Sequence, residues 1–523
     1  MCRRMRSFLV LVMLLATLSV SAQVTTATMS GKVTAQDEPI IGATIVAIHE
    51  PSGTRYGTVT NVSGQFTLQG MRTGGPYKVE ISYVGYQTAI YKGINLLLGE
   101  NYVLNVSLKE SSELLDEVVV TASKDSNMKS DRAGAVTNLT SAKIASIPTV
   151  SRSMNDIMRL SPQSNTTSNG FAAGGGNYRQ SFVTVDGASF NNAFGIGSNL
   201  PAGGAPISLD ALEQLSVSIT PYDVRQSGFT GAAINAVTKS GTNELTGSAY
   251  TFLTNNNLIG DRVGDNSIEL EKSHQYTYGA TLGGALIKNK LFFFVNGEYE
   301  NDLTEGPIAR ARNDESEKYG VNGIHRPVAS KMDEIRDYLI NKYDYDPGAY
   351  QGYNVTVPSY KFLARLDWNI NENNKVNVRF SKTNNKYNAS PSTSVNPMTA
   401  STIFPGNNGT ISSGKGASND EGLYFRNTRY FQEQRFTSVA TEWNAKWGLV
   451  NNTLRGTYSY QDEPRSYDGG SFPTTYILEE GAVYAMFGTE LFTEGNIRQV
   501  KSFTITDEAT WTDRKSTRLN SSH

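Results

Sequence analysis

The chain has 523 residues and a formal net charge of −2, from 47 Lys and Arg against 49 Asp and Glu. This balance gives no reason to expect a nucleic-acid partner, and a mean hydropathy of −0.37 excludes a polytopic helical membrane protein. The content of 48 Gly, 27 Tyr and 21 Phe favours β structure with many turns.

The N-terminus carries the only long apolar run. Three arginines among the first six residues precede an apolar segment over residues 8–18, and small residues end at Ala22. This pattern predicts a cleaved signal peptide over residues 1–22, too short for a transmembrane helix. The single cysteine, Cys2, lies inside it, so the mature chain is expected to contain no thiol and no disulfide.

Residues 23–108 alternate short β-prone runs with turn residues, which predicts an all-β sandwich. The pieces follow in the order G-x-V, then PIIGATI from Pro39, then T-x-x-x-G-x-F, then Y-V-G-Y. This order resembles the carboxypeptidase-regulatory-like domain. The resemblance implies a transthyretin-like fold, and the family's name implies no catalysis.

Residues 109–130 form a polar linker around one β-prone segment, LLDEVVVTA, from Leu114 to Ala122. A single strand between two solvated stretches cannot bury its side chains within its own segment. Two interpretations follow and remain open. The segment either pairs with the sheet edge of a partner protein, or adds one more strand to the neighbouring domain.

Residues 131–241 mix short strands and helices, which predicts a compact α+β domain. Residues 151–160 are typical of a short capped helix, with Ser151 or Ser153 as N-cap. A strand over residues 182–185 ends at Asp186-Gly187, a pair that is more often a turn than a carboxylate site.

From residue 242 to 513, apolar and polar residues alternate over runs of about ten. Such runs, with aromatic residues near their ends, are typical of transmembrane β-barrel strands. A soluble sandwich with one wet face would also alternate, but the signal peptide favours the barrel. The turn at residues 288–290 is tight, whereas residues 301–360 and 388–432 are long and polar. Barrels have short periplasmic turns and long extracellular loops, so the long segments are expected to face outside.

LDEVVVTA, from Leu115 to Ala122, resembles a TonB box. SFVTVDGASFNNAFG, at residues 181–195, is similar to the plug strand that ends in a D-G turn. Residues 212–250 resemble the end of the plug and the entry to the barrel, and INAVTKSG is their most diagnostic part. Together these stretches resemble TonB-dependent outer-membrane receptors, and residues 206–253 resemble the Oar-like branch. The regulatory-like domain in front is typical of the Bacteroidota members of this superfamily.

The resemblance implies import of a bulky or scarce ligand through a plugged barrel in the outer membrane, energised by TonB and its inner-membrane motor. The sandwich and the TonB box would lie in the periplasm. The implied TonB-binding residues are Leu115, Asp116, Glu117, Val118, Val119, Val120, Thr121 and Ala122. The implied plug-motif residues are Asp186, Gly187, Asn235, Thr238, Lys239, Ser240 and Gly241. Besides outer-membrane lipid, the implied partners are an oligosaccharide, peptide or chelate ligand and, in some members, a surface lipoprotein.

Motifs of enzymes are absent from the sequence. It has four histidines and no H-E-x-x-H, C-x-x-C, G-x-S-x-G or phosphate-binding GxxxxGK[ST] pattern. We therefore expect neither an enzyme nor a bound metal or cofactor. Two alternatives to transport are a secreted β-rich adhesin, and a signal-transducing receptor of the same superfamily, which would carry an additional βαβ domain.

The expected fold is mainly β: an N-terminal β-sandwich, an α+β plug domain, and the first part of a transmembrane antiparallel β-barrel. Barrels of this family have 22 strands, whereas about 270 residues follow the plug, enough for roughly eight strands. The barrel is therefore expected to be truncated. Residues 514–523, RKSTRLNSSH, break the alternation and are expected to be a non-native tail.

Overall fold

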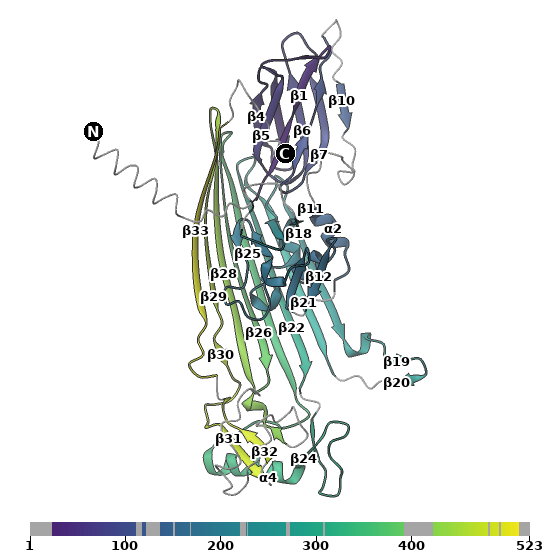
Figure 1. Cartoon of the computed structure of the whole chain (residues 1–523), viewed down its shortest axis with the longest axis vertical. Helices are drawn as coiled ribbons and strands as arrows, with labels where there is room; N and C mark the ends of the chain where they lie inside the picture. The colour runs from purple at the N-terminus through teal and green to yellow at the C-terminus, as the bar shows by residue number, and fades with distance from the viewer. Residues whose placement is uncertain are drawn as a thin grey trace, which may run out of the picture.

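The computed structural model describes residues 24–110, 118–121, 136–149, 152–167, 169–219, 226, 228–267, 272–306, 309–391, 422–479, 482–490 and 493–511. A β-sandwich lies at one end of the long axis, a curved wall of long strands beside the plug domain occupies the middle, and a smaller module lies at the far end (Figure 1). The expected signal peptide and tail lie outside the described residues. In the part of the chain that the structure describes, no helix is long and apolar enough to cross a membrane.

The N-terminal domain is a β-sandwich, as expected, and the described residues form two five-stranded sheets in it. The first contains β1 (Ala27–Ala35), β2 (Glu38–Pro39), β5 (Gln65–Met71), β8 (Asn101–Val103) and β9 (Val106–Ser107). The second has the order β10 (Val118–Thr121), β7 (Ala89–Leu96), β6 (Gly74–Ser82), β3 (Thr44–His49) and β4 (Thr54–Val59). Alternate side chains from both sheets point inward and form one apolar core that includes Met29, Phe66, Tyr77 and Ile81. Burial of these side chains is what holds the two sheets together.

The plug domain is α+β, as expected, and is built on one mixed sheet. Its sheet order is β11 (Val136–Thr140), β16 (Leu212–Ser218), β17 (Ala233–Thr238), β14 (Phe182–Val185) and β15 (Ala188–Ser189). Around it lie α2 (Ser141–Ser146), α3 (Met154–Met158), β12 (Ser164–Thr167), β13 (Gly170–Ala173), η2 (Tyr178–Gln180), η3 (Ala202–Gly204) and η4 (Leu209–Ala211). The expected helix is present as α3 and is shorter than predicted; Ser153 takes the N-cap position, but its side chain makes no capping hydrogen bond. The plug core continues into the wall, because Phe294, Leu363 and Phe436 of the wall belong to the same buried cluster.

The wall is an antiparallel sheet of eight long strands and the short β30 (Arg465–Ser466). In order, the long strands are β18 (Thr246–Asn255), β21 (His274–Ile287), β22 (Leu291–Glu305), β25 (Asn354–Asn371), β26 (Asn374–Ala389), β28 (Tyr430–Trp447), β29 (Val450–Asp462) and β33 (Gln499–Trp511). Tight turns join them at the sandwich end, and long connections lie at the other, as the loop lengths predicted. Within the described residues β18 and β33 do not pair, so the sheet is open.

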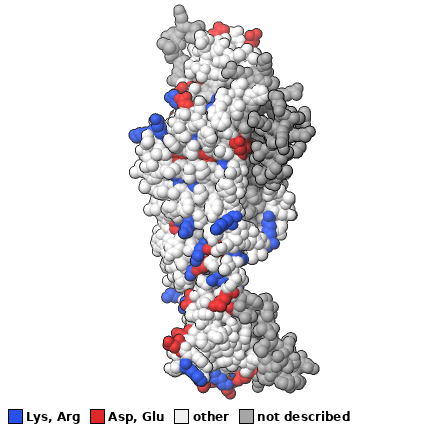
Figure 2. Space-filling view, turned by 90° about the vertical axis from the view of Figure 1, so that its left-hand side faces the viewer, with Lys and Arg blue, Asp and Glu red and all other residues white. Residues whose placement is uncertain are grey.

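The two faces of the wall differ in polarity, as the alternation predicted. On β25, Phe362 and Trp368 are about half exposed on the outer face, whereas Lys361 is buried on the inner face. Figure 2 shows an outer view that is mostly white across the middle of the wall. Aromatic side chains lie toward both ends of the wall strands. Trp443 and Trp447, at the sandwich end, have ring centroids 5.8 Å apart. Two tyrosines, Tyr299 and Tyr360, lie toward the end that carries the long loops. Such paired aromatic bands are typical of strands that cross a bilayer.

The far module contains a helix that the sequence analysis did not predict, because the whole region was interpreted as loop. The module consists of β23 (Arg310–Arg312), β24 (Ile324–Val328), α4 (Ala329–Tyr343), β27 (Leu423–Tyr424), η7 (Arg426–Thr428), β31 (Thr475–Glu479) and β32 (Ala482–Phe487). Helix α4 buries Met332 and Leu339, two turns apart on one face, and ends where Asp344 adopts the left-handed conformation at φ 51°. The connection between β18 and β21 carries three small elements: η5 (Asn256–Leu258), β19 (Arg262–Val263) and β20 (Asn266–Ser267).

Candidate functional site

The turn predicted at Asp186-Gly187 joins β14 to β15, and its carboxylate points back into the plug. Asp186 and Gly187 both have positive φ, at 48° and 77°. One carboxylate oxygen of Asp186 accepts a hydrogen bond from the Thr238 N–H at 3.0 Å, and the other accepts one from the Thr238 hydroxyl at 2.8 Å. The turn therefore closes onto the end of β17, which is the last plug strand before the wall begins.

The same carboxylate faces two arginines of the wall. Asp186 Oδ1 lies 3.1 Å from Arg365 Nη1, and Asp186 Oδ2 lies 3.1 Å from Arg379 Nε. Arg365 on β25 and Arg379 on β26 are direct cross-strand partners. Two like charges placed opposite each other destabilise a sheet unless an anion lies between them. The plug supplies that anion.

Arg379 is fully buried, so its charge depends on the groups around it. Its guanidinium donates to the hydroxyls of Ser381 at 2.7 Å and Ser438 at 3.0 Å, and to the Val185 carbonyl at 3.3 Å. Burying an arginine costs on the order of several kcal/mol unless its guanidinium is paired with a carboxylate and hydrogen-bonded. Asp186 is the carboxylate that compensates this charge.

A second set of contacts extends this cluster along β25. Arg365 pairs with Asp367 at 2.9 Å and donates to the Thr238 carbonyl at 3.0 Å. Ser240 of the plug donates to Asp367 at 2.5 Å. We call the six residues that join plug and wall here the plug latch: Asp186, Thr238, Ser240, Arg365, Asp367 and Arg379.

The structure thus brings together three of the predicted plug-motif residues, Asp186, Thr238 and Ser240, with wall residues that the sequence analysis did not single out as a site. Asn235 acts within the plug, where it accepts the Thr184 hydroxyl at 2.8 Å. The Lys239 N–H donates to the Ala211 carbonyl at 2.8 Å.

The two glycines of the predicted motif lie against the wall. A Cβ on Gly187 would lie 2.4 Å from Arg455 Cδ, and a Cβ on Gly241 would lie 2.4 Å from the carbonyl oxygens of Gly284 and Phe293. Gly241 therefore requires glycine for close approach to backbone atoms of the barrel strands. Gly187 lies against a flexible arginine side chain and requires glycine because of its positive φ.

A second buried carboxylate, Glu298 on β22, joins another part of the plug to the wall. It pairs with Lys361 at 2.8 Å and accepts hydrogen bonds from Ser208 of the plug at 2.7 Å and from Tyr250 at 2.9 Å. A lysine ammonium, a serine hydroxyl and a tyrosine phenol together satisfy this carboxylate, as its burial requires. The plug is therefore held by at least two separate polar clusters on the inner face.

The predicted TonB-binding segment is described only in part. Val118–Thr121 form β10, which pairs parallel with β7 in the register Val118 to Ala89 and Thr121 to Lys92. Leu115, Asp116, Glu117 and Ala122 lie outside the described residues. Of the two arrangements left open by the sequence, the described strand adopts the one in which it extends the neighbouring sandwich. Its role as a TonB-binding strand stays a prediction.

Comparison with known proteins agrees with this layout. Residues 28–109 match the carboxypeptidase regulatory-like domain, and residues 237–313 match an outer membrane beta barrel domain. The chain is 25% identical to the TonB-dependent transporter Oar of Myxococcus xanthus over 259 residues, which are 47% of this chain and 22% of that protein. The chain is a homologue of this TonB-dependent transporter. It is a protein of the outer membrane.

Two solved outer-membrane proteins align with part of the chain. The transporter YddB of Escherichia coli aligns with a TM-score of 0.49 at 10% identity, and the siderophore receptor PirA of Acinetobacter baumannii with 0.43 at 16% identity. Each alignment covers 72% of this chain and 45% of the other. This homologue of Oar thus spans less than half the length of these proteins. The relatives named are transporters and receptors, not enzymes.

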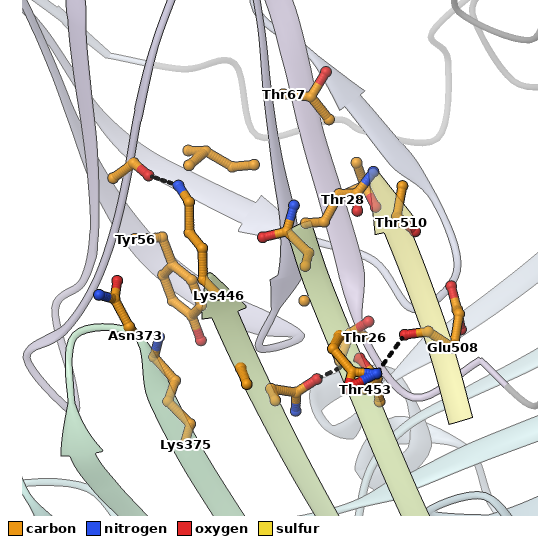
Figure 3. Close-up of a pocket in the computed structure, with 18 of the residues that line it drawn as sticks. Thr26, Thr28, Tyr56, Thr67, Asn373, Lys375, Lys446, Thr453, Glu508 and Thr510 are labelled. Atoms are coloured by element: carbon orange, nitrogen blue, oxygen red, sulfur yellow. Dashed lines mark hydrogen bonds between the residues drawn. The ribbon is translucent and has the colours of Figure 1, made fainter. Parts of the chain in front are cut away.

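The sandwich of this Oar homologue docks on the ends of the wall strands. Thr25 donates to Glu442 at 2.6 Å, while Arg455 donates to Thr25 at 2.7 Å and pairs with Glu442 at 2.6 Å. Lys446 reaches the Gly57 carbonyl at 2.5 Å, beside Tyr56, across a cavity of about 380 Å³ (Figure 3). Sandwich and wall therefore meet through polar contacts around a cavity, in keeping with a docked domain rather than a shared core.

His49 lies where this docked sandwich approaches a wall turn. Its Nδ1 is 2.7 Å from Ser52 Oγ, which is 2.7 Å from Thr54 Oγ1, and Thr54 in turn accepts Asn369 Nδ2 at 2.9 Å. Burial, together with the positive charge of Arg72, lowers the pKa of His49 from 6.5 to about 3. The imidazole is therefore neutral in the folded sandwich at pH values where an unfolded chain would be protonated.

This lowered pKa predicts acid sensitivity of the sandwich. Above pH 6.5 His49 is neutral in both states, and between pH 6.5 and 3 only the unfolded state takes up the proton, so stability falls as pH falls. The expected loss is about 2 kcal/mol at pH 5. Hydrogen exchange of the β3 and β4 amides between pH 7.5 and 5 measures it. The variant His49→Gln should show a flatter pH dependence, and an equal slope in both proteins would contradict the assignment.

Within the described residues, no group of three or more His, Cys, Asp or Glu side chains is arranged to hold a metal ion. The candidate site is the set of contacts that hold the plug and the strand β10 in place. It comprises the plug latch, the Glu298 cluster and the strand β10 at the sandwich edge.

Proposed function

We propose that this protein imports a bulky or scarce ligand through a barrel closed by the plug, with energy delivered by TonB to the segment around Val118–Thr121. The single observation that supports this most is the latch. A plug held to the wall by buried charges stays seated at rest and needs external work to move, and the outer membrane has no energy source of its own.

The order of elements along the chain suits such a mechanism. β10 precedes the plug along the chain, and the first described strand of the plug, β11, lies at the edge of its sheet and pairs with β16. Within the plug, a force that travels along the chain from the segment around β10 reaches this edge strand first. Removal of an edge strand exposes the next one, so the plug can open stepwise while the wall remains intact. The contacts of Asp186 with Arg365 and Arg379 would be among those that must break.

The ligand would first meet the far module, which lies at the end of the wall that carries the long connections. A groove of about 730 Å³ there is lined by Tyr338, Tyr343 and Phe472, with Lys331 and Glu479 at its edge. Aromatic rings with polar rims bind amphipathic molecules. This lining suits the oligosaccharide and peptide classes better than a small inorganic ion.

A pull-down with the periplasmic domain of TonB tests the energised function. A peptide spanning residues 111–124 should be captured, and the same peptide with Val118→Pro should bind about tenfold more weakly, because proline removes one main-chain donor from an added strand. A peptide with Ser111→Pro, outside the β-prone run, serves as the matched control.

Each result has a definite meaning. Equal capture of the Val118→Pro and native peptides would contradict strand addition. Capture of neither would contradict energised import and favour the alternative of a β-rich surface protein with a structural role.

A further inference from the structure

Strand β7 occupies a special place in the sandwich, because it would be the edge of its sheet if β10 were removed. The sheet order is β10-β7-β6-β3-β4, and β7 runs for eight residues from Ala89 to Leu96. A strand of this length with open N–H and C=O groups is a template for another strand. In the described structure the occupant is a piece of the same chain, the four residues of β10.

We propose that the β7 edge of the sandwich is a binding site for Val118–Thr121 and holds this strand away from TonB until the protein is ready for transport. The proposal rests on the function proposed above, since it concerns the same segment. It assigns the regulatory-like domain a task of its own, which is to sequester the strand that TonB needs.

The path of the chain delivers the strand to this edge. The Gln87 N–H donates to the Lys109 carbonyl at 2.9 Å, and Tyr86 forms a β-bridge with Glu110. The last residues of the sandwich therefore lie beside the residues that lead into β7. A strand tethered this close has a millimolar effective concentration at the edge, so an otherwise weak pairing is populated.

Within the described residues, the pairing covers four residues of β7, from Ala89 to Lys92. There β7 carries a bulge, because its register with β6 passes from Tyr91 directly to Ile94, and Gly93 has φ +76°. Bulges bend a strand and terminate pairing. Four residue pairs give a contact that can open reversibly, which a site of temporary storage requires.

Sequestration follows from the position of the strand between two domains. While β10 is bound to β7, a load applied to it passes into the sandwich. Only after β10 leaves β7 does the load pass along the chain to β11 of the plug. The apparent affinity for TonB should then fall in proportion to the fraction of molecules with a free strand.

A reversible cross-link tests the proposal in the full-length protein. Lys92 and Thr121 are direct cross-strand partners, and Lys92 is exposed, so the pair Lys92→Cys/Thr121→Cys should form a disulfide on oxidation. The only native cysteine is Cys2, in the expected signal peptide, so the mature protein gives no background. We expect the cross-linked protein to capture the periplasmic domain of TonB at least tenfold less well, with full recovery on reduction. Val84→Cys/Thr121→Cys is the control pair that should not cross-link.

A second variant weakens the edge without altering the TonB-binding strand. The register with β6 skips Lys92, so Lys92→Pro should loosen β10 with little effect on the rest of the sheet and raise TonB capture several-fold. Val84→Pro is the matched control. Val84 is exposed and is the second residue of a turn that the Tyr86 N–H closes by donating to the Tyr83 carbonyl. Gly85, the next residue, has φ +85°. Proline is favoured at the second position of a turn with this geometry.

The outcomes separate this inference from the proposed function. Absence of the cross-link, or equal TonB capture by cross-linked and reduced protein, would overturn the sequestration while leaving TonB-dependent import intact. Failure of the reduced protein and of the 111–124 peptide to bind TonB would overturn the proposed function itself. Loss of capture on oxidation with recovery on reduction would support both.

Discussion

Asp186→Asn is expected to weaken the seating of the plug in the wall by about 3–5 kcal/mol, the usual cost of removing one partner from a buried ion pair. Asparagine keeps the shape of the side chain and can still accept the Thr238 N–H. It supplies no charge, however, so Asp367 is the carboxylate that remains to Arg365, and Arg379 keeps only hydroxyl and carbonyl acceptors. The cost arises from a buried guanidinium left without a carboxylate.

Hydrogen exchange of β14 and β17 in the membrane-embedded protein measures this loss, because β14 leads into the Asp186 turn and β17 ends at Thr238, which donates to Asp186. Asp210→Asn is the matched control, since Asp210 pairs with Arg152 in a partly exposed position where an ion pair contributes about 0–1 kcal/mol. Adding Arg379→Met to Asp186→Asn should recover much of the protection, because it removes the orphaned charge. Equal exchange in Asp186→Asn and Asp210→Asn would contradict the role assigned to the latch.

The parts of the fold that could be predicted from sequence are those encoded by local periodicity. Alternation alone assigns Phe362 to the outer face and Lys361 to the inner face, because side chains on a strand alternate between its faces. Loop lengths likewise indicated which end of the wall carries the tight turns. Helix α4 escaped prediction because its apolar residues Met332, Ile335 and Leu339 are sparse within a long polar region, although their spacing is helical.

The latch needed information that periodicity does not carry. Arg365 and Arg379 are fourteen positions apart, and only the register of the β25–β26 hairpin places them opposite each other. A tight turn near Asn371 to Asn374 would have allowed that register to be counted from the sequence, so two facing arginines were in principle detectable. Their partner Asp186 was not, because it is joined to them only through the packing of plug against wall. The position of β10 is equally non-local, and its segment carries the same β-prone signal whichever sheet it joins.

Gly241→Ala is expected to destabilise the junction between plug and wall at the upper end of the roughly 1–3 kcal/mol that overpacking costs. The added methyl group would lie 2.4 Å from the carbonyl oxygens of Gly284 and Phe293 and 2.9 Å from the Gly284 nitrogen. All three are backbone atoms of β21 and β22, so no flexible side chain can move aside. The strands themselves must separate, and they do so where the chain passes from the plug into the barrel.

Thermal unfolding of the detergent-solubilised protein measures the effect, and Gly297→Ala provides the control. Gly297 lies on β22 as well, yet a Cβ there would meet no atom within 4 Å, so its replacement should change stability by no more than about 0.5 kcal/mol. Equal unfolding temperatures for the two variants would show that plug and wall can separate at Gly241 without cost. In that case the close approach of the two chains would not limit how the plug moves, and the charges of the latch would be the main resistance to the pull.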